Sequence, residues 1–518
     1  MASDSFQISL FMRKQQQNWN NRHLFRPSIV SIGISVVIFF YVAMRAATLS
    51  ITHDEALTYV WHVTGDWLQI VLFKTPGLPD NNHVLHTLLC KISVALFGLS
   101  ELTLRLPSLL GCIFYLAGLN LCLKRIVPGW LQVLGLLLAG MNPYVLDFFG
   151  LARGYGLGLG FTMLGLAALL DSLAETPGKV RETPALISVM LFSLAVLANI
   201  SFLLVLMAAL AILSVFLLYA GISARHDLST HHSRSHLILL LKILAVTIPL
   251  FAYLILPLSI IHENKLFDMG GSTGFWVDTV GSLIYGTIYD REWLPDQYLL
   301  LEAWVMLTLF SMPIVLWSLR RTDSQRFAAL TVIVTMVGLI VIESLAQHAI
   351  LNVALLQGRR GIALLPLFLL AALMTGNLFH GTSRWVGVIG LLVGMLVPAV
   401  LVVNGLLSMN IKYVYEWKDD ACSKDIMVAI HDKILREKPS VPLHLRVNWV
   451  FEPSTNFYRH TMGIESSLLP LNREGLNGPA DLYYGYTQDQ GLIRKFNVRL
   501  LLREPVSDTV LFEHRDSH

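Results

Sequence analysis

The fold is indicated by the stretch NRHLFRPSIVSIGISVVIFFYVAMRAATLSITHDEALTYVW, which runs from residue 21 to residue 61. Basic residues come first, an apolar run follows from residue 28, and Asp54 and Glu55 stand directly after it. A helix of about 20 apolar residues crosses the hydrocarbon core of a bilayer. Because no small-residue cleavage site follows the run, the stretch predicts a membrane anchor rather than a cleaved signal peptide.

Composition extends this prediction to the rest of the chain. Of the 518 residues, 54% are hydrophobic and 14% are charged, whereas soluble domains are about 25% charged. Further apolar runs begin near residues 104, 130, 151, 184, 201, 237, 300, 327, 361 and 385. With the first run, they predict an all-α polytopic membrane protein of about 11 transmembrane helices. The net charge of +3 is too small to indicate a nucleic-acid partner, and the basic residues are scattered.

The distribution of basic residues predicts the topology. Residues 1–27 are basic and are expected to be cytoplasmic, and later basic loops, such as those at Lys124 and Arg125 or at Arg320 and Arg321, fall on the same side. The agreement requires that residues 84–98, a short apolar stretch containing Lys91, lie in the interface rather than span the bilayer. The loop 50–103 is then wholly external.

The last part of the chain is more polar. After a membrane domain over residues 28–407, residues 408–518 contain the strand-like runs LHLRVNWV, DLYYGY, VRLLL and TVLFEH. A helix-like run, DDACSKDIMVAIHDKILRE, precedes them. These patterns predict a small α/β domain on the external side.

Ionisable residues gather in the segments predicted to lie at the external membrane boundary, where their cost makes them candidates for function. Asp54 and Glu55 follow the first span. The others are His83, His86, Glu101, Arg105, Arg153, Tyr155, Lys265, His348, Arg359 and Arg360. A bland alternative stays open for several of them, because an arginine at a helix end often only anchors the helix in the interface.

At this point the sequence resembles the GT-C glycosyltransferases of the protein O-mannosyltransferase and aminoarabinose-transferase type, and among them the bacterial RgtA/B/C/D-like proteins. The matching features occur in the family's order. They are the acidic DEA element (residues 54–56), an amphipathic external helix, the string from Gly98 to Ser108, and NP (142–143) followed by ARGY (152–155). The resemblance covers about the first 170 residues well and the later membrane part loosely.

The resemblance implies an enzyme that transfers a sugar from a polyprenyl-phosphate donor to an acceptor hydroxyl on the extracytoplasmic face, by direct displacement with inversion. The acceptor is a glycan, a lipid or a protein, and the membrane is the bacterial inner membrane. An alcohol needs a base to accept its proton, and Asp54 is the candidate base, with Glu55 beside it. A lipid-phosphate leaving group needs cations. The candidate donor-phosphate ligands are Arg153, Tyr155, Arg359, Arg360, His348 and Lys265. His83, His86, Glu101 and Arg105 are expected to support the external loop.

Two alternatives stay open at this stage. His83 and Glu55 are candidate ligands for a divalent metal, although no cofactor is required by the sequence. A lipid-linked-sugar transporter or flippase also has about eleven to fourteen spans, but it is expected to show internal repeats and ionisable residues near the middle of the membrane. No convincing repeat occurs in this sequence.

Overall fold

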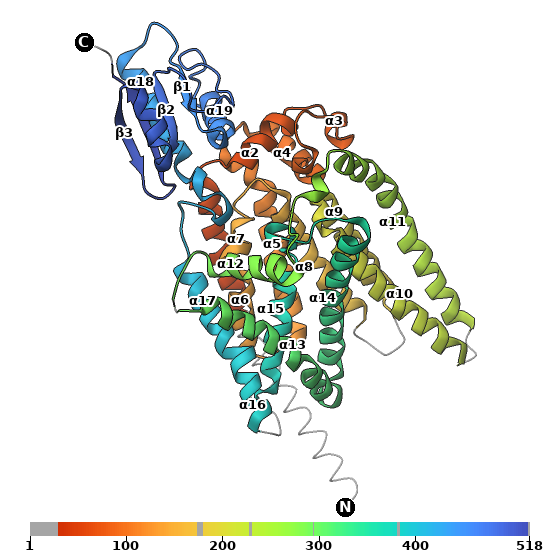
Figure 1. The fold of residues 1–518 in the computed structure, drawn as a ribbon. Helices are drawn as coiled ribbons and strands as arrows, with labels where there is room; N and C mark the ends of the chain where they lie inside the picture. Colours follow the sequence, from red (N-terminus) through yellow and green to blue (C-terminus); the bar gives the residue numbers. More distant parts are fainter. Residues whose placement is uncertain (1–28, 174–179, 227–229, 294, 381–383, 516–518) are drawn as a thin grey trace, which may run out of the picture.

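The computed structural model describes residues 29–173, 180–226, 230–293, 295–380 and 384–515. The predicted cytoplasmic segment 1–27 lies outside the described residues. The fold is an elongated bundle of helices with a small sheet at one end (Figure 1). The two ends differ, because the sheet and the short helices α2, α3 and α4 share the end opposite to that at which the first described helix begins.

Eight described helical segments are long and apolar enough to cross a membrane, judged by length and composition. Those that lie within single helices are Ile29–Thr48, α5 (Glu101–Ile126), α8 (Gly154–Ser172), α13 (Gln297–Thr322) and α14 (Ser324–Leu351). The others belong to α10 (Leu203–His226), α11 (Thr230–Glu263), and the continuous stretch α16 (Arg384–Leu391), η8 (Leu392–Leu396) and α17 (Val397–Leu407). They account for eight of the eleven predicted runs.

The remaining three predicted runs form shorter apolar helices: α6 (Leu131–Gly140), α9 (Glu182–Ala198), and α15 (Leu364–Met374) with η7 (Thr375–His380). The stretch 84–98 forms α4 (Val84–Phe97), which is also too short to be a candidate span. The chain is thus a mostly helical, multi-pass membrane protein, and each of the eleven predicted runs forms an apolar helix in its described residues.

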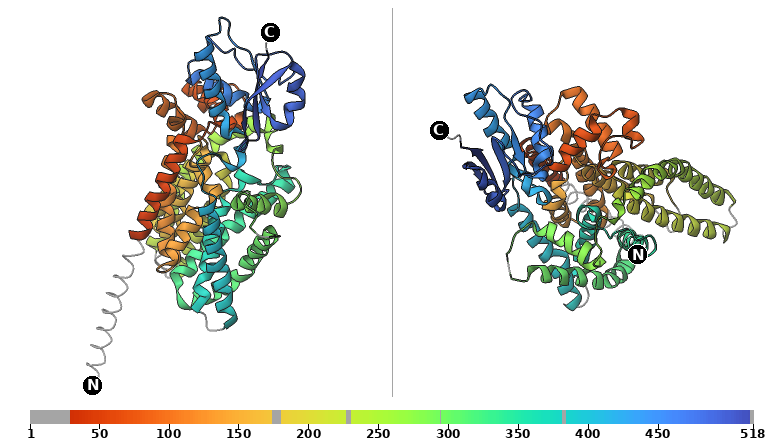
Figure 2. Two further views of the ribbon diagram at one scale, coloured as in Figure 1. Left: turned by 90° about the vertical axis from the view of Figure 1, so that its left-hand side faces the viewer. Right: turned by 45° about the horizontal axis from the view of Figure 1, so that its top comes forward.

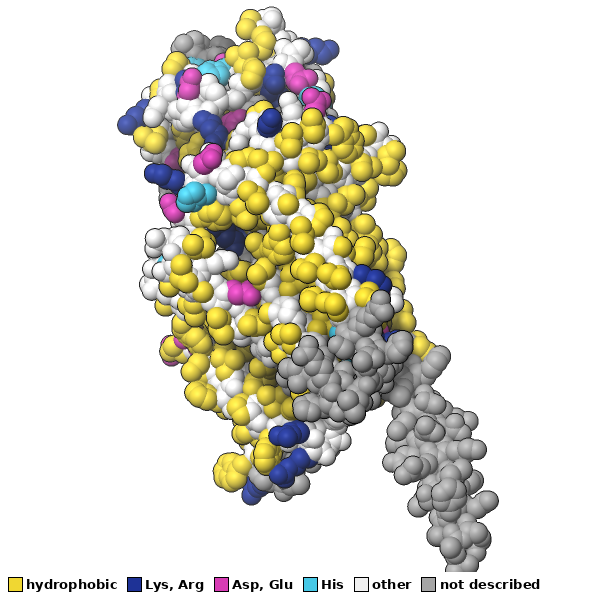
Figure 3. Space-filling model, turned by 90° about the vertical axis from the view of Figure 1, so that its right-hand side faces the viewer, with side chains coloured by type: hydrophobic (Ala, Val, Ile, Leu, Met, Phe, Trp, Pro, Cys, Tyr) yellow, Lys and Arg dark blue, Asp and Glu magenta, His cyan; other side chains and the backbone are white. Residues whose placement is uncertain are grey.

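Burial within the bundle is uneven. Of the most apolar 18-residue stretch of each span, 83% is buried in α8, against 28% in α11 and in α13. Glycines allow α8 to approach α5 closely: a Cβ atom at Gly160 would lie 2.4 Å from the carbonyl oxygen of Gly111. α10 and α11 diverge from the other helices (Figure 2). The face drawn in Figure 3 is broadly hydrophobic, with few charged side chains between its two ends, as expected for a surface in contact with lipid.

Short elements connect the spans at the end of the bundle that carries the sheet. They are α2 (His53–Leu57), η1 (Thr58–Val63), α3 (Trp67–Val71), η2 (Pro79–Asn81), α7 (Pro143–Asp147), η3 (Ile200–Phe202), η4 (Leu266–Asp268), η5 (Trp276–Gly281), α12 (Ser282–Ile288) and η6 (Gly358–Gly361). Several charged residues of the candidate site lie in these short elements, among them Asp54 in α2 and Arg359 in η6.

The predicted α/β segment forms a four-stranded sheet in the order β1-β2-β4-β3. The strands are β1 (Leu445–Val447), β2 (Leu482–Tyr486), β3 (Val498–Glu504) and β4 (Thr509–His514). β1 and β2 are parallel, and the other two pairs are antiparallel. The helical elements here are η9 (Tyr415–Cys422), α18 (Ser423–Glu437), η10 (Trp449–Phe451), α19 (Glu452–Thr461), η11 (Thr487–Asp489), α20 (Gln490–Ile493) and η12 (Arg494–Phe496). Each predicted strand-like run contains one strand, and the predicted helix-like run contains α18.

This C-terminal segment packs directly against α2, the residues before it and the start of α5. Ile51, Ala56 and Leu104 share one hydrophobic core with Ile426 of α18 and Phe457 of α19. The hydroxyl group of Tyr458 accepts a hydrogen bond from the backbone N–H of Ile51 at 2.7 Å. The sheet segment is therefore fixed beside the start of α2.

Candidate active site

Asp54 occupies the first turn of α2, immediately after the first span. Thr52 caps this helix, and the side chain of Glu55 returns to the backbone N–H of Thr52 in a capping box. The Asp54 carboxylate points away from this cap, and its Oδ2 atom lies 3.3 Å from Arg153 Nη2 and 3.2 Å from Arg359 Nη2. The side chain is 19% exposed, so the carboxylate is held in place and remains accessible.

The two arginines control the protonation of Asp54. Burial by itself raises the pKa of the carboxyl group, but the positive charges of Arg153 and Arg359 outweigh burial and hold the pKa below its usual value. Asp54 is therefore a carboxylate at neutral pH.

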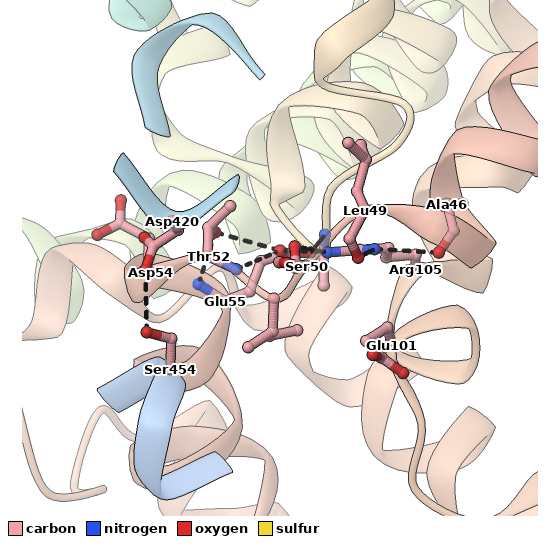
Figure 4. Close-up of polar contacts among 12 residues, drawn as sticks. Ala46, Leu49, Ser50, Thr52, Asp54, Glu55, Glu101, Arg105, Asp420 and Ser454 are labelled. Carbon is pink, nitrogen blue, oxygen red and sulfur yellow. Dashed lines mark hydrogen bonds and ion pairs between the residues drawn. The ribbon is translucent and has the colours of Figure 1, made fainter. Parts of the chain in front are cut away.

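Glu55 has a different environment. It forms a completely buried ion pair with Arg105, with Oε2 2.8 Å from Nη2. Arg105 also donates to the backbone oxygens of Ala46, Leu49 and Ser50, at distances between 2.8 and 3.0 Å. Figure 4 shows this row of contacts from Thr52 through Glu55 to Arg105. Arg105 thus satisfies carbonyl groups at and just after the end of the first span, and the burial of the pair leaves Glu55 no access to a substrate.

Arg359 connects Asp54 to a third acidic residue, which no pattern in the sequence had selected. Its Nη1 atom lies 2.7 Å from Oε2 of Glu416 in η9. The guanidinium group also lies over the ring of Trp417, 4.9 Å from the centroid. Tyr144 donates a short hydrogen bond to the other carboxylate oxygen of Glu416. No local motif identifies Glu416, because its contact with Arg359 depends on the path of the chain after the last span.

A cavity of about 680 Å³ lies next to these residues. Arg153, Tyr155, Arg359, Arg360 and His83 line its polar part, together with the carboxylates of Asp80 and Asp268. Much of the remaining wall is apolar and comes from α9, α10, α11 and α14, including Val196, Leu197, Leu203, Leu204, Leu254, Leu258, Ile261 and Leu351. The cavity thus joins a charged end to an apolar wall formed by membrane helices.

Two buried side chains in this wall retain unused hydrogen-bonding capacity. Arg153 is 3% exposed, yet its Nε and Nη1 atoms have no hydrogen-bond partner within the described part of the chain. Nε2 of His83, a residue 6% exposed, likewise has none there. Burial lowers the pKa of His83 well below its usual value, and the charge of Arg153 adds to this effect, so the imidazole is neutral. Unpaired buried N–H groups carry a desolvation cost that a bound anion would remove.

The other predicted site residues are distributed as follows. Lys265 is exposed, and neither it nor His348 lines this cavity; His348 pairs with the backbone oxygen of Val353 at 2.9 Å. His86 is buried against Ser108, and Glu101 binds Lys424 of α18 at 2.8 Å. The structure therefore brings together four of the six candidate phosphate ligands.

The metal site considered for His83 and Glu55 has no matching cluster. Among the described residues, no group of three or more His, Cys, Asp or Glu side chains is placed to hold a metal ion. The physical reason is that Glu55 faces Arg105, whereas the ring of His83 packs against Tyr155 with centroids 5.6 Å apart.

Comparison with known proteins gives distant structural likenesses. No protein-family model matches the sequence, and no curated protein matches it significantly. ArnT from Cupriavidus metallidurans bound to undecaprenyl phosphate is 14% identical, with a TM-score of 0.46 over 94% of this chain and 98% of that chain. An oligosaccharyltransferase from Archaeoglobus fulgidus is 10% identical, with a TM-score of 0.39 over 90% and 72% of the two chains.

The arabinosyltransferase EmbB from Mycobacterium smegmatis is 11% identical, with a TM-score of 0.42 over 83% of this chain and 42% of that chain. These three proteins are GT-C glycosyltransferases, the superfamily that the N-terminal motifs resemble.

Proposed function

We propose that this protein is a membrane glycosyltransferase that transfers a sugar from a polyprenyl-phosphate donor to an acceptor hydroxyl group, with Asp54 as the general base. One observation carries the proposal. Asp54, an accessible carboxylate, is paired with Arg153 and Arg359 of a cavity. One side of this cavity has guanidinium N–H groups that are unpaired within the described ranges, and the other is a wall of membrane helices.

The phosphate of the donor is bound by arginines in this proposal. Arg153 offers two buried nitrogen atoms, Nε and Nη1, without partners among the described residues, and Arg359 and Arg360 line the same cavity. Guanidinium groups bind phosphate oxygens through charge-assisted hydrogen bonds. The apolar residues of α10, α11 and α14 would contact the polyprenyl chain, which needs a surface continuous with the bilayer.

Asp54 then accepts the proton of the acceptor hydroxyl group as the oxygen attacks the anomeric carbon. The bond from that carbon to the phosphate oxygen breaks, and the lipid phosphate leaves with the bonding electrons. The arginines stabilise the charge that develops on the leaving group. A single displacement inverts the configuration at the anomeric carbon and needs no covalent intermediate with the protein.

Binding of the donor also affects the base. In the free protein, Arg153 and Arg359 lower the pKa of Asp54 and so weaken it as a proton acceptor. A bound phosphate shares these positive charges, and its own negative charge opposes further negative charge nearby. The donor thereby raises the basicity of Asp54 when the acceptor reacts.

The buried pair of Glu55 and Arg105 takes a positioning role in this proposal, and so do Glu101 and His86. The site and residues 408–518 are assigned to the extracytoplasmic face of the plasma membrane. The acceptor is a glycan, a lipid or a protein hydroxyl group. The division into a membrane domain over 28–407 and a C-terminal domain over 408–518 belongs to the same proposal.

The direct test is sugar transfer by the purified protein in nanodiscs, supplied with a panel of radiolabelled polyprenyl-phosphate sugars and candidate acceptors. We expect one donor to lose its label to an acceptor. If the folded protein binds the donors but cleaves none of them and moves them between leaflets, the protein is a lipid-linked-sugar transporter.

A further inference from the structure

The segment Tyr415–Cys422, called the strap below, runs beside the candidate site between α17 and α18. Its backbone N–H at Tyr415 donates to Oδ2 of Asp147 at 2.7 Å. Near its other end, Oδ2 of Asp420 accepts a hydrogen bond from the backbone N–H of His53 at 2.7 Å. The strap is therefore bound to α7 at one end and to the residue before Asp54 at the other.

Between these two contacts, Glu416 shares one guanidinium group with Asp54. Nη1 of Arg359 lies 2.7 Å from Oε2 of Glu416, and Nη2 lies 3.2 Å from Oδ2 of Asp54. Tyr144 holds the second oxygen of the Glu416 carboxylate, and Trp417 lies against the guanidinium face. Of the two ion pairs of Arg359, the one with Glu416 is therefore the shorter. The Glu416 side chain is also held by the hydroxyl group of Tyr144.

We infer that Glu416 is a positioning residue. By pairing with Arg359, it limits how strongly the guanidinium charge acts on the catalytic base Asp54 and on the donor phosphate. This inference rests on the proposed function, because it concerns the same site. Glu416 partly neutralises Arg359, which leaves Asp54 a stronger base and lets the lipid phosphate product dissociate. The C-terminal part of the chain thereby contributes to catalysis without touching the substrate.

Loss of the Glu416 charge has a signature that loss of a purely structural contact would not have. In Glu416→Gln the full charge of Arg359 acts on Asp54, so the pKa of Asp54 falls further and the base weakens. The same freed charge strengthens the attraction for a phosphate. Loss of turnover should therefore accompany tighter binding of the lipid phosphate, whereas a misplaced Arg359 would weaken both.

The experiment compares wild type, Glu416→Gln and Asp419→Asn in nanodiscs. Asp419 is a matched control because it belongs to the same strap but accepts its hydrogen bond from Tyr486, at the surface. Polyprenyl phosphate alone is titrated to obtain Kd, sugar transfer gives kcat and the donor KM as functions of pH, and thermal unfolding confirms that each variant is folded.

We expect Glu416→Gln to lower kcat about 10-fold, to lower the Kd for polyprenyl phosphate by roughly 3-fold or more, and to move the acid limb of kcat down by about one pH unit. Asp419→Asn should match wild type. The inference is overturned if the folded Glu416→Gln protein binds polyprenyl phosphate no more tightly than wild type, or if its acid limb is unchanged.

Tyr144→Phe gives a second test with the opposite sign. Without the hydroxyl donor, the Glu416 carboxylate is less neutralised and pairs more strongly with Arg359, so the Kd for polyprenyl phosphate should rise. A Kd that falls or stays constant in this variant also overturns the inference. If wild type itself neither binds polyprenyl phosphate nor transfers sugar, the proposed function fails and the inference fails with it; the preceding outcomes overturn the inference alone.

Discussion

Asp54 and Glu55 are adjacent in sequence, and their environments separate their roles. Asp54 is partly exposed and paired with two cavity arginines, whereas Glu55 and Arg105 are completely enclosed. The sequence selected both acids because they follow the first span. It could not separate them, since the partner Arg105 lies 50 positions later and the partner Arg359 lies 305 positions away from Asp54.

We predict that Glu55→Gln destabilises the protein strongly. Removing one charge leaves Arg105 buried and unpaired, and breaking a buried ion pair costs about 3–5 kcal/mol. The measurement is the apparent Tm in detergent, compared with Glu474→Gln, whose side chain is 62% exposed and which should change little. A Glu55→Gln protein with the Tm of wild type and no transfer activity would instead mean that Glu55 acts on the substrate.

Arg153→Gln should weaken binding of polyprenyl phosphate by about 10-fold or more, because a charge-assisted hydrogen bond contributes roughly 1.5–3 kcal/mol. Binding of polyprenol, which has no phosphate, should not change. Titration of both lipids checks this, with Arg499→Gln as a control at a side chain that is 60% exposed. Equal losses for the two lipids would contradict a phosphate contact.

Among the elements, the close packing of α5 and α8 sets the position of the site, because Arg153 and Tyr155 lie at the start of α8. Gly160→Ala would place a Cβ atom 2.4 Å from the Gly111 carbonyl oxygen, so the two helices must separate. We predict a lower Tm and weaker binding of polyprenyl phosphate. Gly33→Ala, with nothing within 4 Å, is the matched control; equal behaviour of the two variants would show that this packing is unimportant for the site.

The sequence predicted the elements well where a pattern is local. Four strand-like runs each contain a strand, and the stretch 84–98 forms a short helix rather than a candidate span. The apolar runs also predicted helices at α6, α9 and α15, which are apolar but shorter than the eight candidate spans among the described residues. Hydropathy does not distinguish such helices from spans, because buried helices inside a bundle are as apolar as those in contact with lipid.

For the whole molecule, the cavity and the strap could not be predicted. Arg359 and Glu416 are separated by 57 positions and belong to different predicted domains. Their contact forms because the chain, after its last span, passes beside α7, where the backbone N–H of Tyr415 donates to Asp147. The polar residues of the first loop were found because ionisable groups at the membrane boundary are costly, but the pairing among them is set by the tertiary fold.

We predict that the stability of the protein depends on pH through Asp420, which attaches the C-terminal segment to the residue before Asp54. Burial raises the pKa of this carboxyl group to about 7, against a usual value of 3.8. Between about pH 4 and 7 the folded state therefore binds more protons than the unfolded state, and stability falls as the pH rises, by about 4 kcal/mol in total. Above pH 7 this contribution is constant.

Asp420→Asn should remove this slope. Apparent Tm values measured from pH 4 to pH 8 in one detergent, for wild type and the variant, check the prediction. A wild-type Tm that rises with pH relative to the variant would mean that Asp420 is ionised in the folded state, held by its donors from His53, Ser423 and Ser454.

In the proposed function, Asp54 is the base for transfer of a sugar from a lipid phosphate. The most direct measurement is the single-turnover rate of label transfer from the polyprenyl-phosphate donor in nanodiscs, for wild type, Asp54→Asn and the exposed control Asp425→Asn. We predict a loss of about 10²–10⁴-fold in Asp54→Asn alone, with donor binding retained. Transfer by Asp54→Asn at the rate of wild type would contradict the account.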